Sequence, residues 1–256
     1  MTDAPLQGVG VLVTRPRAQA AELIEAIQNN GGNAICFPVI EIVPRDEPAI
    51  AADAAALPKP DIALFVSRNA VDYGLSHVPG TMIGATGPAT AAAIEKAGQT
   101  VEIKPQQGYD SESMLKEPAL QDVAGKQIQI IRGGDGRELL ADTLRERGAT
   151  VNYLSVYRRG LPTISPESIT DIEAAWRDGK VNAITVMSVA TLKNLVALLP
   201  DWCARQLASV PLVTPAARVI KEALDRYPAS TPILAAGPQA AHMVDAIIRT
   251  TRLTPE

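Results

Sequence analysis

The chain has 256 residues, a net charge of -4 and 46% hydrophobic residues, with only 4% aromatic. This length allows one large α/β domain or two domains of about 120 residues. The acidic balance argues against a general affinity for nucleic acid or anionic lipid, so any anion site must be a local arrangement of donors. Neither a secretory leader nor a membrane-spanning apolar run is visible. We therefore expect a soluble, cytoplasmic protein with no nucleic-acid or membrane partner.

The residues that usually bind metals are few and scattered. Cys36 and Cys203 lie far apart without a C-x-x-C spacing, and His77 and His242 show no metal-ligand spacing. The cysteines are more typical of small buried apolar residues than of a disulfide or a metal site. We therefore expect no metal and no cofactor.

Apolar runs that predict strands alternate with periodic segments that predict helices. Strands are expected within residues 8–14, 34–43, 61–66, 82–85, 101–103, 128–131, 151–157, 183–187, 212–215 and 233–238. The first helix follows from Ala20, Leu23, Ile24 and Ile27, which recur on one helical face. Pro38 interrupts the second of the expected strands. This alternation predicts parallel α/β sheets.

Residues 128–138 contain the most distinctive turn of the chain, because a predicted strand runs there into the sequence RGGDGR. Gly133, Gly134 and Gly136 allow a sharp turn and a close approach to the backbone. Arg132 and Arg137 flank the turn, and a strand end, free N–H groups and two guanidinium groups favour an anion site. Neither a G-x-G-x-x-G spacing nor a Walker A lysine is present, and an ordinary strand-to-helix turn is the alternative.

The order of these turns repeats along the chain. The matched positions are Arg15 with Arg132, Ser67 with Ser188, and Pro88 with Pro215. Two similar halves predict two similar α/β domains, although α/β sequences also resemble one another in general.

Donor side chains collect at the predicted carboxyl ends of the strands, where open α/β sheets bind ligands. They are Thr14, Arg15, Ser67, Asn69, Thr86, Thr90, Arg132, Arg137, Ser188 and Thr214. This set suits a polyanion rather than a metal or a Ser-His-Asp triad. Ion-paired arginines and serines that only cap helices are the alternatives, and Ser111 or Ser113 is expected to cap a further helix.

Taken in order, these turns resemble the uroporphyrinogen-III synthase family over essentially the whole chain. The matching segments are VTRP at 13–16, FVSRNAV at 65–71, IGATGPAT at 83–90, SESML at 111–115, RGGDGRE at 132–138 and VYR at 156–158. The resemblance implies two similar parallel-sheet α/β domains of the flavodoxin-like type, joined by a two-stranded linker, with a cleft between them. One domain would combine residues 1–36 and 160–256, the other would span 43–152, and the linker strands would be 37–42 and 153–159.

The resemblance also implies a reaction, the cyclisation of the linear polycarboxylate hydroxymethylbilane to uroporphyrinogen III in tetrapyrrole biosynthesis, with loss of water and inversion of ring D. Tyr157 matches a tyrosine suspected of donating a proton to the departing hydroxyl; a packed strand tyrosine with a satisfied hydroxyl is the alternative. The implied substrate-binding residues are Thr14, Arg15, Ser67, Asn69, Thr86, Thr90, Ser111, Arg132, Gly133, Arg137 and Ser188. We expect the protein to be a monomer.

Two other functions stay open at this point. A non-catalytic two-domain binding protein for an anionic metabolite would use the same donors. A glycosyltransferase-like or nucleotide-dependent enzyme would need a glycine fingerprint or an acidic nucleotide-binding residue, and the sequence shows neither.

Overall fold

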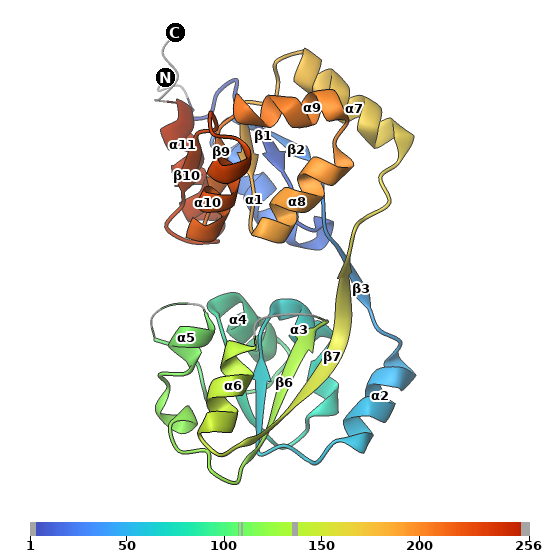
Figure 1. The fold of residues 1–256 in the computed structure, drawn as a ribbon, viewed down its shortest axis with the longest axis vertical. Coiled ribbons are helices and arrows are strands. Elements are labelled where there is room, and N and C mark those ends of the chain that lie inside the picture. The colour runs from blue at the N-terminus through green and yellow to red at the C-terminus, as the bar shows by residue number, and fades with distance from the viewer. Residues whose placement is uncertain (1–3, 107, 109, 135–137, 252–256) are drawn as a thin grey trace. The chain divides into compact units, whose positions relative to one another are not determined.

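The computed structural model describes residues 4–106, 108, 110–134 and 138–251, and it divides into two compact units. Unit 1 comprises Met1–Glu41 and Gly160–Glu256, and unit 2 comprises Ile42–Arg159. Each unit contains a sheet with helices on both faces (Figure 1). The prediction of two α/β sheets with mostly parallel strands is therefore confirmed.

The sheet of unit 1 has the strand order β10-β9-β8-β1-β2. Its strands are β1 (Gly10–Val13), β2 (Asn33–Cys36), β8 (Ala183–Thr185), β9 (Leu212–Thr214) and β10 (Pro232–Leu234). The neighbouring strands pair in parallel, as the continuous apolar runs predict.

Two helical layers cover this sheet, because alternate residues of each strand face opposite sides. Val11 and Val13 pack with α1 (Arg17–Asn29) and α11 (Ala240–Thr251). Leu12 faces the other layer. That layer contains α7 (Pro166–Arg177), α8 (Val189–Leu198), α9 (Asp201–Arg205), the 3-10 turn η3 (Gln206–Ala208) and α10 (Ala217–Arg226).

The sheet of unit 2 has the strand order β3-β7-β6-β4-β5. Its strands are β3 (Glu41–Pro44), β4 (Ile62–Phe65), β5 (Met82–Ala85), β6 (Gln127–Gly133) and β7 (Thr150–Gly160). One face packs against α2 (Glu47–Ala56), α3 (Arg68–Gly74), η1 (Leu75–His77) and α4 (Pro88–Lys96). The other packs against α5 (Ser111–Met114), η2 (Pro118–Leu120) and α6 (Leu139–Glu146).

The repeat seen in the sequence reappears in the strand order. Unit 1 contains the series β9-β8-β1-β2 and unit 2 the series β5-β4-β6-β7. The register agrees as well, because Val13 lies opposite Thr185 and Ile130 lies opposite Leu64. Arg15 and Ser188 therefore have the same relative positions in the register of unit 1 as Arg132 and Ser67 have in unit 2.

One predicted match of the repeat is wrong. Gly84 lies opposite Leu64 and Val213 lies opposite Thr185, so the register aligns Pro88 with Ala217 instead of Pro215. Pro88 and Ala217 are also the first residues of α4 and α10. The similar residues around the two prolines predict an alignment that is shifted by two residues from the one in the structure.

Three local predictions also need correction. Residues 37–40, part of the predicted linker strand 37–42, lie outside any strand, and Pro38 has no N–H group to donate to a ladder. The strand expected at 101–103 is reduced to a single bridge between Gly84 and Ile103. The α5 cap is Asp110, whose carboxylate accepts a hydrogen bond from Ser113 N, rather than Ser111 or Ser113.

Both cysteines are free thiols; Cys203 is buried, as predicted, whereas Cys36 is only partly buried. Burial is the main cause that raises the pKa of the Cys203 thiol to about 11. Across the described ranges, no helix is both long and apolar enough to cross a membrane. Within those same ranges, no group of three or more His, Cys, Asp or Glu residues is placed to hold a metal ion.

Candidate functional site

In unit 2, the predicted donors follow strands that lie side by side. Ser67 follows β4, Thr86 follows β5, Gly133 ends β6, and Tyr157 lies near the end of β7. Because the pairs β5–β4, β4–β6 and β6–β7 are parallel, these carboxyl ends share one edge of the sheet. The structure therefore brings Ser67, Gly133 and Tyr157 together from three neighbouring strands.

Tyr157 is enclosed and its hydroxyl is hydrogen-bonded. The residue is 1% exposed, and its Oη lies 3.0 Å from Ser67 Oγ. Arg159 Nη2 donates to the same Oη at 3.4 Å, and its guanidinium carbon lies 5.9 Å from the ring centroid. The Tyr73 ring packs against the Tyr157 ring at a centroid distance of 6.5 Å. The tyrosine hydroxyl therefore lies below the serine rather than at the surface.

Gly133 makes room for this tyrosine ring. A Cβ atom at Gly133 would lie 2.5 Å from Cε2 of Tyr157, far inside van der Waals contact. The β6–β7 register also shifts between Arg132 and Gly133. Gly134 N donates to the Tyr157 carbonyl oxygen at 2.9 Å and closes the strand end. Packing against the Tyr157 ring therefore requires a glycine at this position.

Ser67 caps α3, because its Oγ accepts a hydrogen bond from Ala70 N at 3.1 Å. Asn69 lies in the first turn of α3 and is half-buried. Thr90 is buried in the first turn of α4. The buried Thr86 donates from its hydroxyl to the Phe65 carbonyl oxygen at 3.4 Å. Ser111, half-buried, is the first residue of α5.

Arg132 is already paired within unit 2. Its Nη1 lies 3.1 Å from Glu138 Oε1, its Nε donates to Gly134 O at 2.9 Å, and its guanidinium carbon lies 4.3 Å from the Tyr153 ring centroid. Tyr153 also donates to the second carboxylate oxygen of Glu138. The ion-paired alternative for Arg132 is thus what the structure shows. Arg137 lies outside the described residues.

Glu138 and Tyr153 perturb each other's pKa values. Hydrogen bonds from Tyr153 and then from Arg132 lower the pKa of the exposed Glu138 carboxyl. Desolvation, followed by the hydrogen bond to Glu138, raises the pKa of the Tyr153 hydroxyl to about 12. The pair therefore holds a carboxylate against Arg132 at neutral pH.

In unit 1, Thr14 and Arg15 follow β1. Thr14 is fully buried, and its hydroxyl donates to the Thr185 carbonyl oxygen on β8. Arg15 is half-buried and donates from Nη2 to the Pro238 carbonyl oxygen, while its Nε is buried with no hydrogen-bond partner in the described part of the chain. Burial lowers the pKa of the Arg15 guanidinium more than nearby Glu22 raises it. The Thr14 hydroxyl is thus hydrogen-bonded within the sheet, whereas the Arg15 Nε–H group has no partner among the described residues.

Ser188 is the unit 1 equivalent of Ser67. Its Oγ accepts from Thr191 N at 3.1 Å and caps α8. The Ser188 hydroxyl also lies 2.9 Å from Thr191 Oγ1. No tyrosine hydroxyl is recorded at Ser188 among the described residues, so equivalent caps have different second partners.

The sequence reasoning did not identify Arg159, Glu138 or Tyr153 as parts of this arrangement. Arg159 lies two residues after Tyr157 on the same strand, and alternate strand residues share a face, so that spacing was a usable signal. Glu138 and Tyr153 belong to different elements, and their contact depends on the β6–β7 register, which the sequence does not specify.

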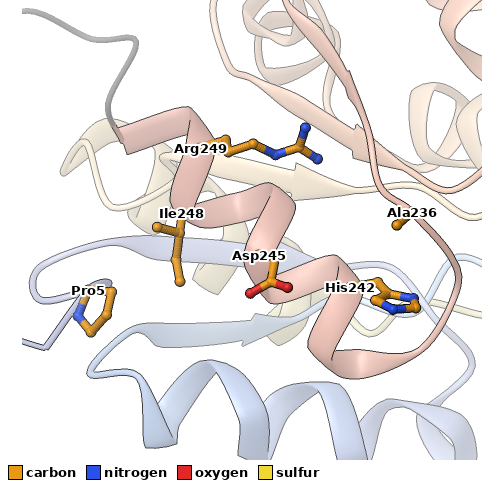
Figure 2. A pocket seen from close by; sticks show the side chains of 6 residues that line it. All are labelled: Pro5, Ala236, His242, Asp245, Ile248 and Arg249. Atoms are coloured by element: carbon orange, nitrogen blue, oxygen red, sulfur yellow. The ribbon is translucent and has the colours of Figure 1, made fainter.

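A separate hollow of about 550 Å³ lies in unit 1. Pro5, Ala236 and four α11 residues line it, and Figure 2 shows His242, Asp245, Ile248 and Arg249 projecting from that helix. Arg249 Nη2 donates to the Leu234 carbonyl oxygen at 2.7 Å. None of the predicted site residues lines this hollow.

Comparisons with known proteins agree over most of the chain. The family model described as uroporphyrinogen-III synthase HemD matches residues 21–247. Uroporphyrinogen-III synthase of Escherichia coli is 33% identical over 205 residues, which cover 76% of this chain and 81% of the relative. The Salmonella typhimurium enzyme of the same name is 31% identical over the same shares.

Solved structures share the fold. Uroporphyrinogen III synthase from Thermus thermophilus has a TM-score of 0.61 at 22% identity, covering 96% of this chain and 100% of that one. The Helicobacter pylori uroporphyrinogen-III synthetase has a TM-score of 0.63 at 12% identity, covering 94% and 99%. The comparisons do not favour a non-catalytic binding protein. The chain belongs to the uroporphyrinogen-III synthase family, the cyclising lyases of porphyrin biosynthesis.

Proposed function

We propose that this chain catalyses the cyclisation of hydroxymethylbilane to uroporphyrinogen III, with loss of water and inversion of ring D. The observation that carries the proposal is the family match over residues 21–247, which includes the donor-bearing strand ends of unit 2 and Ser188 of unit 1 and begins after Thr14 and Arg15. The donors themselves fit the substrate, because hydroxyl, amide and guanidinium groups bind carboxylates.

The proposed carboxylate contacts are the predicted residues that are not fully enclosed. They are Arg15, Asn69, Ser111 and Ser188, all half-buried. Ser67 is half-buried too, but its hydroxyl is hydrogen-bonded to Tyr157 Oη, so we group it with the tyrosine. Arg15 is supported by its unpaired Nε, since a buried guanidinium donor gains from a carboxylate partner. Thr14, Thr86 and Thr90 are buried, and we assign them to supporting these strand and helix ends.

In this proposal, Arg132 binds a substrate carboxylate only by giving up its ion pair with Glu138. Its guanidinium is 12% exposed and already paired with Glu138. A substrate carboxylate would replace the Glu138 carboxylate on the same guanidinium, with little net change in the number of charged hydrogen bonds. Arg132 would then contribute less to the binding free energy of the substrate than Arg15.

The cyclisation itself requires orientation more than reactive side chains. The electron-rich pyrrole expels the hydroxyl, and the enzyme's task is to hold the chain so that ring D closes in the inverted sense through a spiro intermediate. Positioning of this kind supplies rate because the bound geometry avoids an entropic cost. Protonation of the departing hydroxyl adds to it, and we propose Tyr157 as the ultimate source of that proton.

The test is an isomer analysis. The purified protein is mixed with freshly generated hydroxymethylbilane, and the products are oxidised and separated by chromatography. We expect faster consumption of the substrate and mainly isomer III, whereas the reaction without protein gives isomer I. Binding without a change in the isomer ratio would instead support the non-catalytic binding protein.

We further propose that the protein acts as a monomer in the cytoplasm, without nucleic-acid or membrane partners. The net charge of -4 supports the absence of nucleic-acid binding. Sedimentation at increasing protein concentration tests the first point, since a concentration-dependent mass would contradict it. Fractionation of the source cells tests the second.

A further inference from the structure

The described residues of unit 2 enclose the Tyr157 side chain almost completely. The residue is 1% exposed, Gly133 lies directly against its ring, and Tyr73 packs beside it. Its Oη lies between Ser67 Oγ at 3.0 Å and Arg159 Nη2 at 3.4 Å. Ser67, by contrast, is half-buried. A proton from Tyr157 must therefore pass through a neighbouring group.

The hydrogen bonds around Tyr157 have one consistent direction. Arg159 is always a donor, so Tyr157 Oη accepts from it. The 3.0 Å contact between Ser67 Oγ and Tyr157 Oη allows either atom to donate. A buried O–H group needs an acceptor, and among the hydrogen-bond partners recorded for Tyr157 Oη in the described part of the chain, Ser67 Oγ can accept while Arg159 cannot, so we take Tyr157 as the donor. Ser67 Oγ then accepts from both Tyr157 and Ala70 N, which uses its two lone pairs. The remaining Ser67 O–H bond is left to donate outward.

We propose that Ser67 donates the proton to the departing hydroxyl of the substrate and that Tyr157 acts only by reprotonating Ser67. The proposal rests on the proposed function, which supplies the leaving hydroxyl. Ser67 is then the catalytic residue, and Tyr157 and Arg159 are positioning residues behind it.

The step balances without an external reagent. As the C–O bond of the hydroxymethyl group breaks, its electron pair stays on oxygen, which takes the Ser67 proton and leaves as water. The Tyr157 proton moves to Ser67 Oγ, and the pyrrole chain is left as a cation. The new carbon–carbon bond first forms at the substituted α-carbon of ring D and gives the spiro intermediate, which has no proton to lose at that carbon. The bond that joined ring D to ring C then breaks and leaves a cation on ring C, which the free α-carbon of ring D attacks. That carbon loses its proton as the pyrrole regains aromaticity, and the proton returns through Ser67 to Tyr157.

Arg159 offsets the charge that this transfer creates. Loss of the proton leaves negative charge on Tyr157 Oη, and the guanidinium Nη2 lies 3.4 Å away. A cation beside a developing anion stabilises it, and the exposed Arg159 side chain places its guanidinium against the enclosed Tyr157 ring. The arrangement therefore has a donor, a relay and a counter-ion in one line.

The experiment is a double-mutant cycle on turnover. Ser67→Ala, Tyr157→Phe and the double variant are compared with wild type by kcat, KM and the ratio of isomers. Each single variant is expected to lose about 10²-fold in kcat, near the lower end for a general acid. The double variant is expected to lose no more than either single variant, because both changes break the same relay. Ser67→Thr keeps the hydroxyl and is expected to stay within about tenfold of wild type.

The matched control is Ser165→Ala. Ser165 caps α7 by accepting from Ser168 N at 3.2 Å and lies outside the proposed site. Its loss is expected to lower Tm by about 2–4 °C, similarly to Ser67→Ala, without changing kcat.

Each outcome decides between specific alternatives. A double variant whose loss equals the product of the two single losses would show independent contacts and would overturn the relay. So would a Ser67→Ala enzyme with wild-type kcat. If wild type leaves the isomer ratio unchanged, the proposed function fails as well, and this is distinguishable because wild type is assayed in the same series.

Discussion

The close approach of Gly133 to Tyr157 leads to a quantitative prediction. In Gly133→Ala the new Cβ would lie 2.5 Å from Tyr157 Cε2 and 2.6 Å from its Cζ. Ordinary contact begins near 3.4 Å, so the ring must move by about 1 Å. The 3.0 Å contact between Tyr157 Oη and Ser67 Oγ would then stretch beyond hydrogen-bond range.

The expected cost has two parts. Overpacking of a buried ring costs about 1–3 kcal/mol, and loss of one hydrogen bond costs about 0.5–1.5 kcal/mol. Together they suggest about 1.5–4.5 kcal/mol, or about 3–18 °C in Tm. The chain offers a control in Gly134→Ala, because a Cβ at Gly134 meets nothing within 4 Å.

Thermal unfolding monitored by circular dichroism measures the stability of each variant, and kcat measures the effect of displacing the Tyr157 hydroxyl. We expect Gly133→Ala to lose both stability and turnover while Gly134→Ala stays near wild type. Equal Tm and kcat for the two variants would refute the packing argument. A Gly133→Ala protein that is less stable but fully active would show that the position of the Tyr157 hydroxyl does not affect turnover.

Three further outcomes follow from the polar contacts. Glu138→Gln removes the charge that competes for Arg132, so KM should fall in initial-rate measurements; an unchanged KM would mean that Arg132 does not bind substrate. The pKa of Tyr153, about 12 in the fold against about 10 when unfolded, makes its stabilising contribution complete below pH 10 and lost as pH rises to about 12. Urea titrations across that window should therefore show a steeper loss in wild type than in Tyr153→Phe, and parallel losses would contradict the linkage. Arg15→Gln should raise KM by about tenfold or more with little change in Tm, because a charged hydrogen bond to a carboxylate is lost; an equal loss of Tm and activity would make Arg15 structural.

The sequence was sufficient for the fold because the relevant signals are local. The apolar run around Leu12 predicts a buried strand, and the spacing of Ala20, Leu23 and Ile27 predicts the helix that covers it. The pairing of Arg15 with Arg132 was also visible, since equivalent turns keep their residue types. Such patterns depend on a few neighbouring residues, so tertiary structure does not need to be known.

The partners of the site residues could not be read in the same way. A threonine after a strand can face a ligand or bond to the next strand, and Thr14 does the latter through Thr185. Arg132 is paired with Glu138, and β7 brings Tyr153 alongside both residues. These outcomes depend on register and on small turns, and a change of one residue in register would move every side chain to the opposite face.

The two capping serines show how one repeated device acquires different uses. Ser67 and Ser188 have extended backbones, accept the same type of helix N–H bond and stand at matching register positions. After Cys36 the unit 1 chain leaves the sheet, whereas β7 continues to Gly160 and carries Tyr157 to the serine. Among the described residues, Ser188 therefore has the hydroxyl of the buried Thr191 beside it but no tyrosine hydroxyl. Ser188→Ala should consequently raise KM and leave kcat close to wild type, whereas Ser67→Ala should lower kcat, and a kcat loss of similar size in both would assign the chemistry to the shared cap instead of the tyrosine.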